Sequence, residues 1–137
     1  MQHHLELSDA AFELQFKSCE FPAVLFSHEA HLRLAWIHIQ RYGVEQAVAN
    51  VCAQLQAYVQ HLGAADKYNE TLTIAAVRAV YHFMLKTNFS GFQDFIAQNP
   101  CLKQNFKELI FQHYQTDIFN SETAKKQYLE PELLPFD

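Results

Sequence analysis

Apolar residues recur at helical spacing along three long stretches of the chain. The first is Phe26–Gly43, in which Ser27 is a favoured capping residue and the final glycine suits the position after a helix end. The second covers about Val44–Leu62, and the third about Glu70–Lys86. This pattern predicts three long helices, of which the first two are joined by a sharp turn.

Shorter helices are predicted on either side of the long ones, and their ranges are about Asp9–Ser18, Ser90–Gln98, Cys101–Tyr114 and Ser121–Tyr128. Pro22 predicts an extended link into the first long helix. The last nine residues contain two prolines and are expected to be extended, with Leu133, Leu134 and Phe136 lying against the bundle. We therefore predict one all-α domain over residues 1–137, a bundle of three long core helices with shorter terminal helices packed on it.

Composition excludes several classes of protein. The chain has 137 residues, half of them hydrophobic, with three Gly, four Pro and a formal net charge of −5. Lys125–Lys126 is its only basic cluster, which argues against nucleic-acid binding. No signal peptide is recognisable, and the apolar stretch Leu72–Leu85 is too short to span a bilayer. The cysteines, Cys19, Cys52 and Cys101, are far apart, so we expect free thiols and a cytoplasmic protein.

Two histidines occupy positions of the first long helix where apolar residues are expected. At roughly 100° per residue, His28 falls within the apolar stripe and His31 lies one helical step away on the same side. Arg33 falls on the opposite arc and is expected to face water, and His4, near the start of the chain, is expected to be solvated. Buried histidines need partners, so a carboxylate or a carbonyl should face this pair.

The third long helix carries a carboxylate in its apolar arc. Glu70 aligns with apolar residues of the following turns, and Thr73 is its neighbour, whereas Thr71 belongs to the polar arc that continues through Arg78, His82 and Lys86. An acid in the first turn of a helix is also common for electrostatic reasons alone.

Topology brings the two unusual features together. If the first and second long helices are antiparallel, and the second and third likewise, then the first and third are parallel. His28, His31 and Glu70 are therefore expected at one end of the bundle, where Tyr68 and Thr73 could join them. Two histidines and a carboxylate are a ligand set for catalytic zinc or non-haem iron. The same groups also suit acid–base chemistry or a closed hydrogen-bond network without catalysis. A divalent metal and no cofactor at all are equally compatible with these residues.

The stretches FSHEAHLRLAW, KYNETLT and LEPELLPFD resemble a family of small bacterial proteins with no assigned function, whose pattern is F-x-H-x-x-H-L-x-x-A-W, then Y-H-E-T-x-T, then P-D-L-x-P. The resemblance covers most of the chain and implies that the motif positions are His28, His31, Trp36, Tyr68, Glu70, Thr71 and Thr73. Asn69 stands where the family usually has His, which weakens the case for a tight metal site.

Two functions follow from these residues. The first is a small enzyme or binding protein in which His28 and His31 bind a metal or a small-molecule ligand, Glu70 is a ligand or base, and Tyr68, Asn69 and Thr73 complete the pocket. The second is a non-catalytic interaction domain in which these residues form a buried network. We expect no nucleic-acid or membrane partner, and either a monomer or a homodimer.

Overall fold

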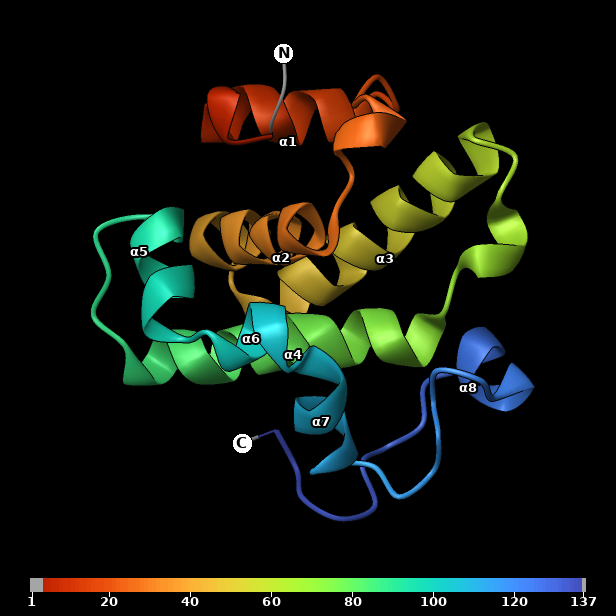
Figure 1. Cartoon of the computed structure of the whole chain (residues 1–137). Coiled ribbons are helices and arrows are strands. Elements are labelled where there is room, and N and C mark those ends of the chain that lie inside the picture. The colour runs from red at the N-terminus through yellow and green to blue at the C-terminus, as the bar shows by residue number, and fades with distance from the viewer. Residues whose placement is uncertain (1–3, 137) are drawn as a thin grey trace. The chain divides into compact units, whose positions relative to one another are not determined.

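The structure, a computed structural model, describes residues 4–136 (Figure 1). Over this range the chain forms eight α-helices and three short 3-10 helices, with no strand. The all-α class is thus confirmed, with three long helices and shorter helices toward both ends. No helix among these residues is both long and apolar enough to cross a membrane.

Contacts divide the chain into two compact units, residues 1–68 and residues 69–137. The single domain over residues 1–137 stays a prediction. The helices of unit 1 are η1 (His4–Glu6), α1 (Asp9–Lys17), η2 (Ala23–Leu25), α2 (His28–Tyr42), α3 (Val44–His61) and η3 (Ala65–Lys67). The helices of unit 2 are α4 (Glu70–Lys86), α5 (Phe92–Gln98), α6 (Cys101–Gln104), α7 (Phe106–Phe111) and α8 (Glu122–Lys126).

Within unit 1, α2 and α3 pack against each other and α1 contacts both. Gly43 connects α2 to α3 with a φ of 84°, a backbone conformation that residues with a Cβ atom rarely adopt. Its amide donates to the carbonyl of Ile39 at 2.9 Å, so it ends α2 as the sequence predicts. This turn positions the two long helices side by side.

Aromatic side chains form much of the core of unit 1. Phe16 of α1 stacks on Tyr58 of α3, with ring centroids 4.5 Å apart, and Phe12 lies 5.0 Å from Phe21. The hydroxyl of Tyr58 donates to the carbonyl of Phe21 at 2.7 Å, which satisfies the one polar atom of that buried ring. These contacts hold α1 and the segment after it against α3.

Two connections differ from the sequence prediction. Pro22 is extended, but the residues after it, Ala23–Leu25, form a 3-10 helix. The stretch predicted as one helix over Cys101–Tyr114 is broken at Asn105, which has φ −128° and ψ 37°. Asparagine competes for backbone hydrogen bonds and tolerates non-helical conformations, so a helix readily breaks there.

The tail of unit 2, Leu129–Phe136, is extended as predicted, but only part of it is buried. Phe136 is 7% exposed and its ring stacks on that of His113, with centroids 4.0 Å apart. The prediction that Leu133 and Leu134 are also covered is wrong, because these side chains are 55% and 52% exposed. The backbone of Leu133 and Leu134 is hydrogen-bonded to His113, which leaves their side chains exposed, whereas the ring of Phe136 reaches the core.

Hydrogen bonds fix this tail to the segment after α7. The Tyr114 hydroxyl donates to the carbonyl of Leu129 at 2.8 Å. The carboxylate of Glu132 accepts from the amides of Gln115 and Thr116 and from the Thr116 hydroxyl, the last at 2.7 Å. These hydrogen bonds lower the pKa of the Glu132 carboxyl group because they favour its charged form.

Candidate functional site

The amino-terminal end of α2 carries the two histidines that the sequence singles out. The Ser27 hydroxyl accepts from the amide of Ala30 at 3.1 Å, which confirms the predicted cap. His28, in the first turn, is exposed. The prediction that it lies in a buried apolar stripe is therefore wrong, because the helix begins at this residue and its first turn is open to solvent.

His31 lies one turn further along α2 and is less accessible. Its ring is 5.8 Å from that of Phe26, and its Nε2 atom is buried without a hydrogen-bond partner among residues 4–136. Burial, together with the nearby His28, lowers the pKa of His31 from 6.5 to about 4. The imidazole is therefore neutral at pH 7, so one ring nitrogen keeps a lone pair available for a proton donor or a metal ion.

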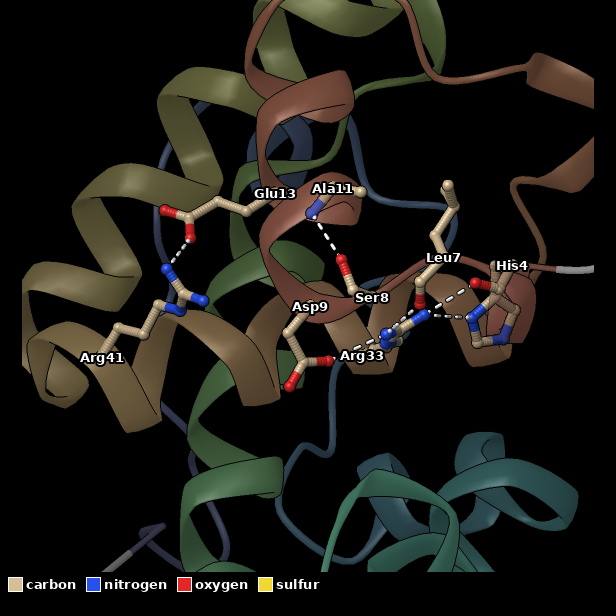
Figure 2. Close-up of polar contacts among 8 residues, drawn as sticks. All are labelled: His4, Leu7, Ser8, Asp9, Ala11, Glu13, Arg33 and Arg41. Atoms are coloured by element: carbon tan, nitrogen blue, oxygen red, sulfur yellow. Dashed lines mark hydrogen bonds and ion pairs between the residues drawn. The ribbon is translucent and has the colours of Figure 1, made fainter.

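Arg33, on the arc expected to face water, is buried instead, at 5% exposure. Its guanidinium group donates to the carbonyls of His4 and Leu7 at 2.7 and 2.8 Å and to the Asp9 carboxylate at 2.8 Å (Figure 2). It also lies over the ring of Phe12, 4.8 Å from the centroid. The prediction is wrong because η1 and the start of α1 cover this side of α2. Their carbonyl and carboxylate oxygens accept several hydrogen bonds from the one guanidinium group.

His4, expected to be solvated, is 1% exposed. Its Nε2 lies 2.8 Å from a carboxylate oxygen of Glu29, and its Nδ1 lies 3.4 Å from Nη1 of Arg33. Because a guanidinium only donates, Nδ1 acts as the acceptor and Nε2 carries the proton given to Glu29. We name His4, Leu7, Asp9, Glu29 and Arg33 the Arg33 network. Its hydrogen bonds join η1, α1 and α2 and indicate a structural role, although the Nε atom of Arg33 is buried without a partner among residues 4–136.

Toward the carboxyl-terminal end of α2, a second polar cluster surrounds Glu13 of α1. Its carboxylate pairs with Arg41 at 3.0 Å and accepts a hydrogen bond from the hydroxyl of Tyr42. His38 is fully buried, and its Nδ1 lies 3.3 Å from the side-chain amide nitrogen (Nδ2) of Asn50. Burial lowers the pKa of His38, so this imidazole is also neutral at pH 7.

The start of α4 holds the second motif, and its side chains are bonded to backbone atoms. Asn69 accepts from the amide of Leu72 at 2.9 Å as the helix cap and donates to the carbonyl of Ile118 at 2.8 Å. The Thr73 hydroxyl donates to the Asn69 carbonyl at 2.7 Å. These bonds tie the first turn of α4 to the segment before α8, and a ligand-binding role for Asn69 and Thr73 stays a prediction.

Thr71, expected on the polar arc, is fully buried. Its hydroxyl donates to the carbonyl of Gln127 at 2.8 Å and accepts from the amide of Leu129 at 3.0 Å. The helical wheel misplaced it because the chain after α8 returns to cover the start of α4, an event that helical spacing does not encode. One hydroxyl thus satisfies two backbone groups of an extended segment.

Glu70 and Tyr68 are both partly buried, on either side of Asn69. Glu70 occupies the first turn of α4, where a negative charge is favoured. Their participation with His28 and His31 in one pocket stays a prediction. Within residues 4–136, no group of three His, Cys, Asp or Glu side chains is arranged to hold a metal ion.

The fold defines an all-helical protein with two compact units, one containing a buried arginine network and a pair of neighbouring histidines. A scan of protein-family models and searches of curated proteins and of solved structures give no match to this chain. The functional interpretation therefore depends on the side chains of this chain alone.

Proposed function

We propose that this protein binds a divalent transition-metal ion at the amino-terminal end of α2, with His28 and His31 as its ligands. The supporting observation is the buried Nε2 atom of His31, which has no hydrogen-bond partner among the described residues. A buried polar atom without a partner costs roughly 1–3 kcal/mol, which a bound ligand would recover. His28 is exposed three residues earlier, on the same side of the helix, and so is accessible to an ion from solvent.

The protonation state of His31 supports the same proposal. Metal ions bind the neutral imidazole, and a histidine with a pKa of about 4 is neutral through the physiological range. Two histidines leave the other coordination positions of a zinc or nickel ion to water or a carboxylate. The same histidines also suit acid–base chemistry.

The test is elemental analysis by plasma mass spectrometry, together with calorimetric titration of Zn²⁺ and Ni²⁺, on protein purified without a histidine tag. We expect one metal site that is lost in His28→Ala and in His31→Ala. His61→Ala is the matched control, since His61 is an exposed histidine at the end of α3. Equal metal binding by all three variants, or no saturable binding by the original protein, would overturn the proposal.

A non-catalytic interaction domain is the second candidate. It is favoured by the hydrogen bonds of Asn69, Thr71 and Thr73, whose side chains all pair with backbone atoms of their own unit. If this function holds, His28→Ala and His31→Ala change no binding property of the protein, whereas changes at the threonines lower its melting temperature.

A bacterial, cytoplasmic origin belongs to the same proposal. Cys19, Cys52 and Cys101 are free thiols, which are typical of reducing compartments. The motif resemblance described above supports a bacterial source. Alkylation of the three thiols in intact cells, without prior reduction, is the measurement that checks the compartment.

A further inference from the structure

A cleft in unit 2 lies between the second half of α4, the end of α7 and the tail. Its volume is about 370 Å³, near the lower end of the range for small-molecule sites. The residues that line it are His82, Phe83, Lys86, Leu109, Gln112, His113, Leu134 and Pro135. We name it the tail cleft, because Leu134 and Pro135 form one of its walls.

Three polar groups of the tail cleft suit a negatively charged ligand. Lys86 is a cation, the amide of Gln112 can donate hydrogen bonds, and the ring of His82 carries an N–H donor. The described lining contains no Asp or Glu, although the whole chain has 15 acidic and 10 basic residues. In an acidic protein, a cleft lined only by basic and neutral side chains selects for anions.

The basic groups follow one face of α4. Arg78, His82 and Lys86 are four residues apart, so they align along the helix, and the tail crosses this row. Arg78 lines a second cleft of about 210 Å³, which shares Pro135 with the tail cleft and is also lined by Glu130. The tail therefore separates Arg78, which has an acidic neighbour, from His82 and Lys86, which share a cleft without one.

The remaining wall is apolar and held in place. Phe83, Leu109, Leu134 and Pro135 contribute hydrocarbon surface. The tail side of this wall is fixed by His113, whose Nδ1 donates to the carbonyl of Leu134 at 2.7 Å, and the amide of Leu133 donates to the carbonyl of His113 at 3.0 Å. A fixed apolar wall opposite cationic groups fits a ligand with a charged head and a hydrocarbon body.

We propose that the tail cleft binds a small organic carboxylate with an aliphatic body, with Lys86 and His82 at the carboxylate and Phe83, Leu109 and Leu134 along the chain. All these residues belong to unit 2, so the proposal is independent of the histidines of α2.

The test is a titration of ¹⁵N-labelled full chain with octanoate, followed by amide chemical shifts. We expect saturable shifts of the amides of residues 82–86, 112–113 and 134. Acetate, which lacks six methylene groups, should bind at least about tenfold more weakly, since each buried methylene is worth about 0.8 kcal/mol. Octanol, which lacks the charge, should bind at least about fivefold more weakly than octanoate.

Variants identify the charged contacts. Lys86→Gln should weaken octanoate binding about fivefold, the effect of losing one charge contact. His82→Ala should also weaken it, because it removes the ring N–H donor. Lys126→Gln is the control, because Lys126 is an exposed lysine of the same unit that does not line the cleft. Circular dichroism confirms that the variants are folded. Absence of saturable shifts at the cleft, or octanol binding equal to octanoate with no effect of Lys86→Gln, would overturn the proposal.

Discussion

Replacement of Arg33 by methionine is the sharpest test of the Arg33 network. Methionine keeps the unbranched stem but removes every donor. The His4 carbonyl then keeps only the amide of Leu7, at 3.1 Å, and the Leu7 carbonyl loses the donor that Arg33 supplied. A buried acceptor left without a donor costs about 1–3 kcal/mol. The contact with the Phe12 ring adds about 1 kcal/mol.

Part of this cost is recovered. The Asp9 side chain is 43% exposed and regains water when its partner is removed. The methionine also fills apolar space without a charge to desolvate. We therefore expect a loss of about 3 kcal/mol in the free energy of unfolding, in line with the about 3–5 kcal/mol typical when one partner of a buried pair is removed.

The measurement is urea unfolding followed by the fluorescence of Trp36, which lies on α2 itself and is the only tryptophan of the chain. Arg41→Met is the matched control, an arginine of the same helix that pairs with a carboxylate of α1 but is 44% exposed (Figure 2). Such exposed pairs contribute at most about 1 kcal/mol. Arg33→Lys should fall between the two, because an ammonium cannot reach all the oxygens at once. Equal destabilisation by Arg33→Met and Arg41→Met would show that the buried hydrogen bonds of Arg33 contribute no more than an exposed ion pair.

Three further predictions concern single side chains. The pKa of His31 is lowered from 6.5 to about 4, so the unfolded chain takes up a proton before the folded one and the free energy of unfolding falls as the pH drops from 6.5 toward 4. Between pH 7 and pH 5, in the presence of a chelator, the free energy of unfolding of His31→Gln should fall by about 2 kcal/mol less than that of the original protein, as measured by urea unfolding. Thr71→Val should cost about 1–2 kcal/mol and speed hydrogen exchange of the Leu129 amide, whereas Thr71→Ser should not. The hydrogen bond from Thr116 lowers the pKa of the Glu132 carboxyl group, so its charged form holds the tail at neutral pH and this contribution is lost as the pH falls through the lowered pKa. Glu132→Gln should therefore speed exchange at the Thr116 amide at pH 7, and the difference from the original protein should shrink on acidification.

Helical periodicity predicted the elements that depend on neighbouring residues. The cap at Ser27 and the end of α2 at Gly43 are where the sequence places them, because each is decided by a few adjacent backbone groups. The break at Asn105 was the exception, since a single asparagine inside an apolar repeat is a weak signal.

The burial of polar side chains could not be predicted in the same way. A helical wheel treats Arg33 and Thr71 as outward residues, since their neighbours on the wheel are polar. Both are buried because segments distant in sequence, η1 in one case and the chain after α8 in the other, bring backbone oxygens and amides to them. No local pattern encodes such a partner, and the exposure of His28 depends in the same way on what covers the helix start.

The bond between Thr71 and Leu129 has a consequence for the order of folding. It joins residues 58 positions apart, whereas the Tyr58 bond that closes the core of unit 1 spans 37. Closing a longer loop costs more chain entropy, and contacts distant in sequence slow the search for the native state. During synthesis, unit 1 has all its residues as soon as Tyr68 is made, but the start of α4 must wait for Leu129 to be added. Until then, the hydroxyl of Thr71 lacks the Leu129 amide that pairs with it and the start of α4 lacks its contacts with α8, so nascent chains halted within α7 or α8 are the ones we expect chaperones to bind.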